Sequence, residues 1–440
     1  MKHKLLVLTL VLFVLLLLVS AALFLQSRSA AVEPPQGEAI AAVKETPEPT
    51  PPPTPEPTPV PTPAPQGAAA QLTLSLTAPQ AASAAVLDGN LYTDYTFEGG
   101  TTLTLSADDE ISALYVIFGT YPGNWTLRSG GAEQPCGQDG FLHECVFLER
   151  PDASIELVFP DGDVMIRDLY AFSDGYLPTF VQTWHNISED EGADILLFST
   201  HYDDELLFFG GLIPYYSAVR GLRVQVAYMT SNYLSDFSNY RFRPHEALDG
   251  LWTAYTHFYP VTNEVPDREC YGYLDAQRIY GEDQFTEFQV EQIRRFKPLV
   301  VVTQAENGEY GHGAHVLTSL SVERAVEAAA DPEQFPESAA RYGVWDTPKT
   351  YLHLYGDWSE STMLNYEIIS QQLGLRSPFQ VAQEAYRQHI TQQQWVGFYV
   401  YSYDHPFDSH RFGLYRSLVG PDAEKDDLME HVSREAFPIP

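Results

Sequence analysis

The folded part of this 440-residue chain carries two successive hydrophobic patterns. Between residues 71 and 178, short segments that alternate apolar and polar residues, or that are rich in β-branched and aromatic residues, are separated by Gly, Pro, Asp and Asn. This pattern is typical of an all-β domain, and we predict a β-sandwich over residues 71–180. The predicted strands are 72–78, 101–106, 111–119, 125–128, 141–148, 154–160 and 164–173.

From residue 190 onward, short apolar runs alternate with segments of helical spacing. This alternation predicts a Rossmann-like α/β domain over residues 190–440, with a parallel sheet covered by helices on both faces. Ligands of such folds bind at the carboxyl ends of the strands. The predicted strands are 194–200, 223–230, 299–304 and 351–355. The predicted helices include 205–219, 289–296, 316–330 and 378–394, and Ser377 is the predicted N-cap of the last of these. The segment 412–420 is predicted to be a loop or an edge strand.

The N-terminus is predicted to be a transmembrane signal anchor within residues 1–30. An apolar run from Leu5 to Leu25 follows the basic start Met1-Lys2-His3-Lys4, and as a helix it would cross a bilayer core of about 30 Å. The basic start favours a cytoplasmic N-terminus, which places the rest of the chain outside the cell. A cleaved signal peptide, with small residues near Ala30, is the alternative, and the protein would then be secreted.

A proline-rich linker is predicted over residues 31–70. Its sequence from Thr46 to Pro65 repeats Thr-Pro and Glu-Pro pairs and has no apolar period. Such a segment forms an extended polyproline spacer rather than a packed core.

Charge and cysteine content narrow the range of partners. The chain has 25 Lys and Arg against 59 Asp and Glu, a formal net charge of −34. Nucleic-acid and anionic-lipid binding both depend on clustered basic residues, so we expect no nucleic-acid partner and membrane contact only through the N-terminal helix. Three cysteines are too few for a cysteine-only zinc cluster. Outside the cell a disulfide between Cys136 and Cys145 is chemically reasonable, although the sequence leaves the pairing open.

Two motifs at predicted strand ends carry candidate chemistry. His201-Tyr202-Asp203-Asp204-Glu205 follows the strand 194–200, and Tyr310-Gly311-His312-Gly313-Ala314-His315 follows the strand 299–304. Imidazole and carboxylate donors from two strand ends form an N/O/N set suited to zinc, and three protein ligands leave a position for water. Taken alone, the first motif could be a helix N-cap and the second a pair of surface histidines. Their joint occurrence in one α/β domain favours a metal site, and Glu205 is interpreted as a first-turn residue stabilised by the helix dipole.

These motifs resemble the hallmarks of the PIG-L/LmbE-type zinc-dependent N-acetylglucosaminyl deacetylases, His-Pro-Asp-Asp-Glu and His-Pro-Asp-His. The resemblance covers about 250 residues and includes Gly210-Gly211, Arg243-x-x-Glu246 and the 351–354 strand. The resemblance implies Zn²⁺ bound by His201, Asp204 and His315, with Asp203 as general base. It further implies that His312 protonates the leaving amine or steadies the oxyanion, that Tyr310 helps to polarise the acetyl carbonyl, and that Arg243 contacts the substrate.

The chain departs from the family pattern at two positions. Tyr202 replaces the usual Pro, and Ala314 replaces an Asp beside the acid histidine. Because a nearby negative charge stabilises imidazolium, the pKa of His312 should be less well supported without that carboxylate.

The β-domain has a weaker resemblance to discoidin-like, galactose-binding-like sandwiches. It depends on Leu87-Asp88-Gly89-Asn90, a Trp after a mid-domain strand, and a closing strand near Tyr170. This resemblance implies a carbohydrate- or wall-binding module, and a spacer domain that binds nothing is the alternative.

Together these features predict an extracellular, membrane-anchored zinc deacetylase acting on an N-acetylated sugar or glycan. One alternative is a carbohydrate- or cell-wall-binding protein whose hydrolase domain is inactive. The other is a metal-dependent amidase or esterase with a non-sugar substrate, because the motifs define hydrolysis better than they define the leaving group. The aromatic residues between Trp395 and Phe407 are predicted to pack against the sheet edge, and a cleft that binds sugar faces is the alternative. His389, His405 and His410 are further candidates for the pocket, weaker than the two motifs.

Overall fold

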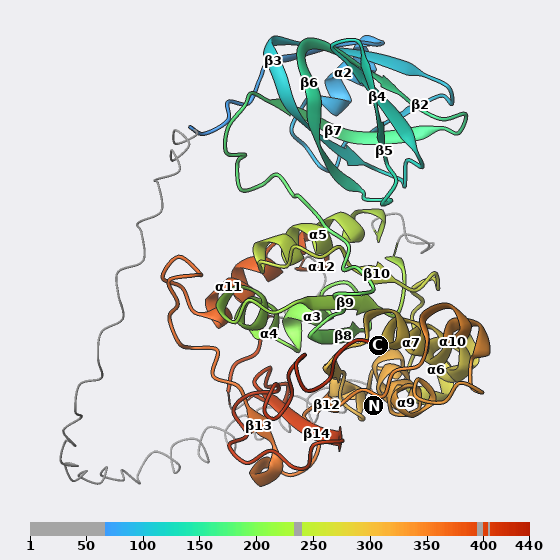
Figure 1. Cartoon of the computed structure of the whole chain (residues 1–440), viewed down its shortest axis with the longest axis vertical. Helices are drawn as coiled ribbons and strands as arrows, with labels where there is room; N and C mark the ends of the chain where they lie inside the picture. The colour runs from blue at the N-terminus through green and yellow to red at the C-terminus, as the bar shows by residue number, and fades with distance from the viewer. Residues whose placement is uncertain (1–66, 233–239, 394–398, 404) are drawn as a thin grey trace, which may run out of the picture. The chain divides into compact units, whose positions relative to one another are not determined.

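The computed structural model describes residues 67–232, 240–393, 399–403 and 405–440 (Figure 1). The predicted membrane span and nearly all of the predicted linker lie outside these residues, and both stay predictions. Within the described ranges, no helix combines the length and the apolar character needed to cross a bilayer.

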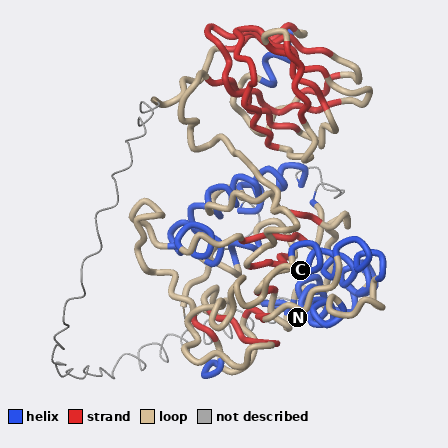
Figure 2. Tube along the Cα trace, viewed as in Figure 1, coloured by secondary structure: helices blue, strands red, loops and turns tan. Residues whose placement is uncertain are grey.

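The first folded region is an antiparallel β-domain with its own hydrophobic core (Figure 2). Its strands pair in the order β2-β7-β3-β6-β4-β5, and β1 pairs with β3. Alternate residues of the long strands, such as Leu103 and Leu105, point into the core. The elements are β1 (Leu74–Thr77), α2 (Gln80–Val86), β2 (Tyr95–Phe97), β3 (Thr102–Phe118), β4 (Trp125–Ser129), β5 (Ala132–Cys136), β6 (His143–Val158) and β7 (Val164–Phe172).

Two pairs of predicted strands are each one long strand. Segments 101–106 and 111–119 are both part of β3, and 141–148 and 154–160 are both part of β6. The polar residues between them look like a turn in the sequence, but β3 and β6 continue to pair there through register shifts between Ser106 and Ala113. The described strands therefore form one continuous hydrogen-bonded sheet, and the predicted sandwich stays a prediction.

The pairing that the sequence leaves open is absent from the structure: Cys136 and Cys145 are both free thiols. Cys136 is buried in the main core of the β-domain, whereas Cys145 packs against a separate cluster that contains Tyr115 and Phe172. The side chains belong to different cores, which explains why they do not pair.

The second folded region is an α/β domain built on a mixed sheet of order β10-β9-β8-β11-β12-β14-β13. The strands from β10 to β12 are parallel, as predicted, but β14 runs antiparallel to both β12 and β13. The predicted loop or edge segment 412–420 is thus largely β14, placed between two other strands. The strands are β8 (Ile195–Ser199), β9 (Val224–Tyr228), β10 (Val261–Thr262), β11 (Val300–Thr303), β12 (Lys349–His353), β13 (Thr362–Met363) and β14 (Arg411–Ser417).

Helices cover this sheet, and one predicted helix is broken. The predicted helix 205–219 consists of α3 (Asp204–Leu207), α4 (Leu212–Pro214) and a π-helical turn (Tyr215–Val219), because Gly210 adopts a positive φ of 50° between them. At the predicted N-cap, Gln380 N donates to Ser377 Oγ over 3.2 Å and Ser377 N donates to Gln380 Oε1 over 2.9 Å, a complete capping box. The remaining helices are α5 (Arg243–Thr253), α6 (Tyr273–Tyr280), α7 (Glu282–Phe296), α8 (Gly308–Gly311), α9 (Gly313–Ala328), α10 (Pro336–Tyr342), α11 (Pro378–Tyr386) and α12 (Ile390–Gln393), with 3-10 turns at Tyr240–Phe242 and Trp358–Glu360.

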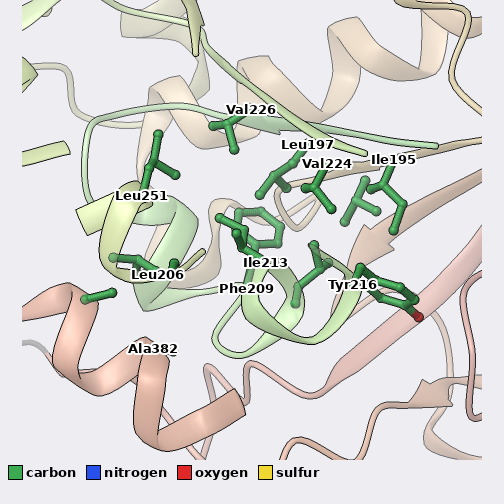
Figure 3. Close-up of a cluster of buried hydrophobic side chains, with 14 of the residues drawn as sticks. Ile195, Leu197, Leu206, Phe209, Ile213, Tyr216, Val224, Val226, Leu251 and Ala382 are labelled. Carbon is green, nitrogen blue, oxygen red and sulfur yellow. The ribbon is translucent and has the colours of Figure 1, made fainter. Parts of the chain in front are cut away.

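The central strand β8 is buried on both faces, which explains its continuous apolar sequence. Ile195 and Leu197 pack into one cluster, and Leu196 and Phe198 into another. Figure 3 shows the first cluster, in which β8 and β9 side chains meet Leu206, Phe209 and Leu251 from the covering segments. The packing on both faces fixes the position of the loop that follows β8.

Candidate metal centre and active site

The two motifs lie at the carboxyl ends of neighbouring parallel strands, as the sequence predicts. β8 pairs with β11 through Leu197 and Val302, so the loops after Ser199 and Thr303 leave the sheet at the same edge. His201 lies in the first loop, and His315 lies in the first turn of α9. Residues 114 positions apart are thereby brought together.

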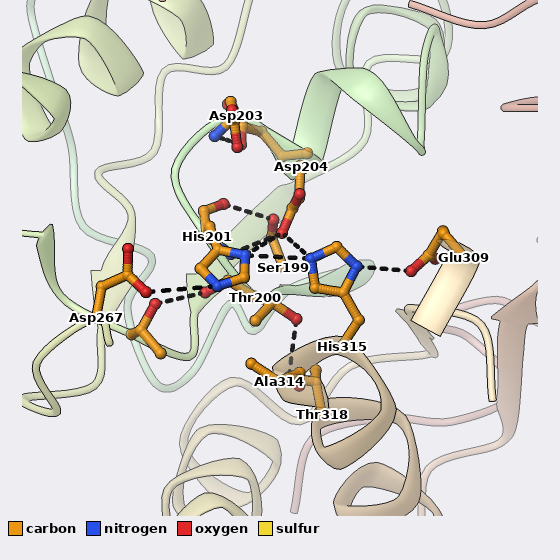
Figure 4. Close-up of polar contacts among 12 residues, drawn as sticks. Ser199, Thr200, His201, Asp203, Asp204, Asp267, Glu309, Ala314, His315 and Thr318 are labelled. Carbon is orange, nitrogen blue, oxygen red and sulfur yellow. Dashed lines mark hydrogen bonds and ion pairs between the residues drawn. The ribbon is translucent and has the colours of Figure 1, made fainter. Parts of the chain in front are cut away.

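The three predicted metal ligands converge. Asp204 Oδ2 lies 3.0 Å from His201 Nδ1 and 3.1 Å from His315 Nε2, and these two nitrogens are 3.1 Å apart. Figure 4 shows the two imidazole rings on either side of the Asp204 carboxylate. Donor atoms around a tetrahedral zinc ion are separated by roughly 3.3 Å, so this triangle fits a divalent cation of that size. The nitrogen and oxygen donors also match the chemistry that zinc prefers.

His312 is a fourth donor close to this triangle. Its ring centroid lies 4.8 Å from that of His201 and 4.7 Å from that of His315, and the ligand atoms of the three histidines all lie within 4.8 Å of one another. Burial, then the neighbouring imidazoles of His315 and His201, lower the pKa of His312 to about 2. A lowered pKa of His312 agrees with the prediction made from Ala314, which stands where the family has an aspartate. At neutral pH His312 is therefore a neutral imidazole, which disfavours its predicted role as the acid for the leaving amine.

Asp203 has the properties of a general base. Its side chain is buried, and its Oδ2 has no hydrogen-bond partner among the described residues. Burial and the adjacent charge of Asp204 raise the pKa of Asp203 to about 7. A carboxylate with this pKa accepts and releases a proton near neutral pH.

Glu205 holds the backbone of Asp203 in place. Asp203 has a strained φ of 124°, and its N–H donates to Glu205 Oε2 over 2.8 Å. The other carboxylate oxygen of Glu205 lies 3.2 Å from His389 Nε2, and both side chains are fully buried. Glu205 lies in the first turn of α3, as predicted, and its buried carboxylate also connects Asp203 to His389. No sequence pattern connects His389 with the two motifs, because it follows the second motif by more than seventy residues; only the folded structure reveals its contact with Glu205.

Residues 196–326 match the family model described as "PIG-L: GlcNAc-PI de-N-acetylase". This segment is a PIG-L domain. It contains both motifs and the complete triangle of donor atoms.

Curated relatives resemble the PIG-L domain over short stretches. The chain is 33% identical over 112 residues to a mycothiol S-conjugate amidase of Streptomyces coelicolor, covering 25% of this chain and 35% of the relative. It is 45% identical over 62 residues to a 1D-myo-inositol 2-acetamido-2-deoxy-alpha-D-glucopyranoside deacetylase of Catenulispora acidiphila, covering 14% of this chain and 18% of the relative. The chain thus spans about a third or less of the length of these two relatives. Among solved structures, N,N'-diacetylchitobiose deacetylase from Pyrococcus horikoshii is similar with a TM-score of 0.35 and 16% identity, covering 46% of this chain and 71% of that chain.

Tyr310 borders the metal-ligand triangle of the PIG-L domain, and the charge of Arg243 acts on Asp203 beside it. The Tyr310 ring lies 5.8 Å from that of His312 and 5.7 Å from that of His315 and is half-exposed. Burial of its hydroxyl and the charges of Asp204 and Asp203 raise its pKa, so the hydroxyl keeps its proton and can donate a hydrogen bond. Arg243 is the first residue of α5, and its charge acts on Asp203, partly offsetting the rise in the pKa of that carboxyl.

Both departures from the family motifs are accommodated by packing. The ring of Tyr202 lies 4.4 Å from that of Tyr228, and its hydroxyl lies 3.0 Å from Thr262 Oγ1. These contacts hold the loop where the family has a proline. Ala314 is fully buried in the hydrophobic cluster that also contains Cys270 and Ala276.

Two further carboxylates touch the predicted ligands on their outer sides. Glu309 Oε2 lies 2.7 Å from His315 Nδ1, and Asp267 Oδ1 lies 3.5 Å from His201 Nε2 (Figure 4). The position of Glu309 beside Tyr310 was a usable signal in the sequence. Asp267 lies in an irregular segment far from both motifs, where no pattern singles it out.

The C-terminal aromatic residues have mixed environments. Tyr401 is buried and stacks on His405 with ring centroids 4.1 Å apart, while Tyr399 is 55% exposed. Phe407 lies 6.0 Å from the Tyr310 ring, which connects this segment to the site. His410 is buried and lies 3.0 Å from Asp408 Oδ1, so it is a packing residue rather than a pocket residue.

Proposed function

We propose that the PIG-L domain of this chain is a zinc-dependent hydrolase that removes the acetyl group from an N-acetylated amino sugar of the N-acetylglucosamine type. The observation that carries the proposal is the triangle of His201, Asp204 and His315 donor atoms, 3.0–3.1 Å apart, with Asp203 beside it. The similarity to the 2-acetamido-2-deoxy-glucopyranoside deacetylase of Catenulispora acidiphila supports amide hydrolysis on such a sugar.

The residues around the triangle have complementary roles. A bound zinc ion supplies Lewis-acid activation of water and of the amide carbonyl. Asp203 takes the proton of the attacking water, because its raised pKa makes it a base near neutral pH. Tyr310 donates its hydroxyl hydrogen to the carbonyl oxygen as negative charge develops there. Asp203 then returns the proton to the departing nitrogen, since the pKa of His312 is too low for that role.

The identity with the mycothiol S-conjugate amidase favours a second candidate, hydrolysis of a larger amide on a non-sugar substrate. The same water activation would serve both reactions, which differ in the acyl group released and in the amine that carries it. Comparing acetate release with cleavage of longer acyl amides separates the two candidates.

We also propose that the enzyme acts outside the cell, held by the predicted helix of residues 5–25 and the proline-rich linker. The basic start followed by the apolar run from Leu5 to Leu25 supports this placement. Protease treatment of intact cells tests it: digestion of the PIG-L domain is expected, and complete protection would contradict the proposal.

The deciding experiment measures acetate release from N-acetylglucosamine and its oligosaccharides by the purified protein. Activity should disappear with a chelator and return with Zn²⁺. A protein that binds zinc but releases acetate from none of these substrates, nor cleaves longer acyl amides, would support the alternative of an inactive hydrolase domain.

A further inference from the structure

A buried carboxylate joins the predicted metal ligand His315 to a second histidine. Glu309 Oε2 lies 2.7 Å from His315 Nδ1, and Glu309 Oε1 lies 3.0 Å from His353 Nδ1. All three side chains have 0% exposure. These residues come from three elements, α8, α9 and β12, so the contact is built by the tertiary fold and not by a local sequence motif.

The backbone at Glu309 is strained. Its φ of 57° and ψ of −74° lie in a region that residues with a side chain rarely adopt, and its neighbour Gly308 also has a positive φ. A glycine would relieve this strain. The chain instead carries a glutamate, whose carboxylate is held by three groups, since Ala305 N also donates to Oε1 over 2.9 Å.

The hydrogen-bond partners define how the two imidazoles are oriented. The His353 ring lies between two acceptors, the carbonyl oxygen of Asp408 at 2.8 Å from Nε2 and Glu309 Oε1 at 3.0 Å from Nδ1, and these two contacts fix the ring beside Glu309. At His315 a hydrogen on Nδ1 donates to Glu309, so Nε2, which faces Asp204 and His201, is the nitrogen that can offer a lone pair to a metal. A lone pair at this position is what a metal ligand requires.

We propose that Glu309 and His353 are positioning residues: Glu309 fixes the ring orientation and tautomer of His315 for metal binding, and His353 fixes Glu309. The proposal rests on the metal site of the proposed function. A carboxylate that accepts a hydrogen bond from a ligating histidine also increases the basicity of that ligand. A purely structural ion pair is the competing explanation, and it would affect unfolding without affecting metal affinity.

The test measures the affinity of the metal-free full chain for Zn²⁺ alone, by competition with a chromophoric chelator. Glu309→Gln should weaken zinc binding about 10- to 100-fold, and His353→Asn should weaken it by a smaller factor. Asp422→Asn is the matched control, because Asp422 is also a buried carboxylate, paired with Lys349 Nζ at 2.5 Å, but it contacts neither motif. This control should leave the zinc affinity unchanged even where it lowers stability.

A tautomer measurement gives a second readout. The ¹⁵N chemical shifts of the His315 ring in the zinc-loaded chain should show a hydrogen on Nδ1 and a metal-bound Nε2 in the wild type, and a mixture of ring states in Glu309→Gln. If Glu309→Gln does not fold, His353→Asn carries the same two measurements. Zinc affinity within twofold of wild type, in folded variants, would overturn the inference while leaving the proposed function intact. A wild-type chain that binds no zinc would overturn both.

Discussion

Asp203 and Asp204 are adjacent in the chain, yet their environments shift their pKa values in opposite directions. Burial and the charge of Asp204 raise the pKa of Asp203 to about 7. Burial alone would raise the pKa of Asp204 as well, but His315 and His201 hold it well below the usual range. One carboxylate therefore stays ionised as a ligand, while its neighbour exchanges a proton near neutral pH.

This division of roles predicts the effect of replacing the base. Asp203→Asn should reduce the rate of acetate release by about 10²–10⁴-fold, because the amide cannot take the proton of water. The zinc content should remain one ion per chain, since the ligand triangle does not include Asp203. Steady-state kinetics and metal analysis of the same preparation check this, and loss of zinc from Asp203→Asn would contradict the assignment.

The identity of the third ligand is tested by a matched pair of variants. Asp204→Asn should lose most of its bound zinc, because Asp204 Oδ2 lies within 3.1 Å of both other ligand atoms. His312→Gln should retain zinc, because His312 lies beside the triangle without completing it. Metal analysis after dialysis distinguishes the two variants. The reverse result would make the three histidines the ligand set.

The sequence predicts site residues only where candidate metal-ligating side chains directly follow a recognisable strand. Buried strands such as β8 are recognisable because both faces are apolar, and a motif that follows such a strand must lie at the edge of the sheet. In contrast, Glu205–His389 and Glu309–His353 are contacts between segments far apart in the chain. No periodicity relates their members, so the roles of these carboxylates require the folded structure.

The same limit applies to the fold. The strands β3 and β6 are longer than predicted because their central polar residues pair across the sheet, a contact that local composition does not reveal. The break in the predicted helix 205–219 has a local cause in the positive φ of Gly210. Even so, a lone glycine within an otherwise helical pattern does not distinguish a break from a tolerated residue.

Arg294 is predicted to be a stability determinant of the α/β domain. It is fully buried, and its guanidinium donates to the carbonyl oxygens of five residues. These are Ala328, Ala329, Asp331, Gln334 and Phe335, at 2.7–3.1 Å. Arg294→Met should lower the free energy of unfolding by about 3–5 kcal/mol, because these buried acceptors lose their donors. The neighbouring, partly exposed Arg295 provides the control: urea unfolding of Arg295→Met should differ from wild type by much less. Equal losses in both variants would exclude this role for Arg294.

The buried histidine His143 is predicted to make stability depend on pH. Its Nε2 lies 2.9 Å from His245 Nδ1 and its Nδ1 lies 3.0 Å from the Tyr115 hydroxyl. Burial lowers the pKa of His143 to about 3. The unfolded chain takes up a proton at this side chain below about pH 6.5, whereas the folded chain does so only near pH 3, so stability is lost as the pH falls through that interval.

Replacing His143 should therefore remove part of this pH dependence. As the pH falls from 6 to 4, the free energy of unfolding of the wild type should decrease relative to that of His143→Gln by up to about 1.4 kcal/mol per pH unit. Urea unfolding at a series of pH values gives this difference directly, and the exposed His185, replaced by Gln, is the control that should show a much smaller trend. A constant difference between wild type and His143→Gln across this range would mean that His143 takes up its proton equally in the folded and unfolded states, contrary to its burial against His245.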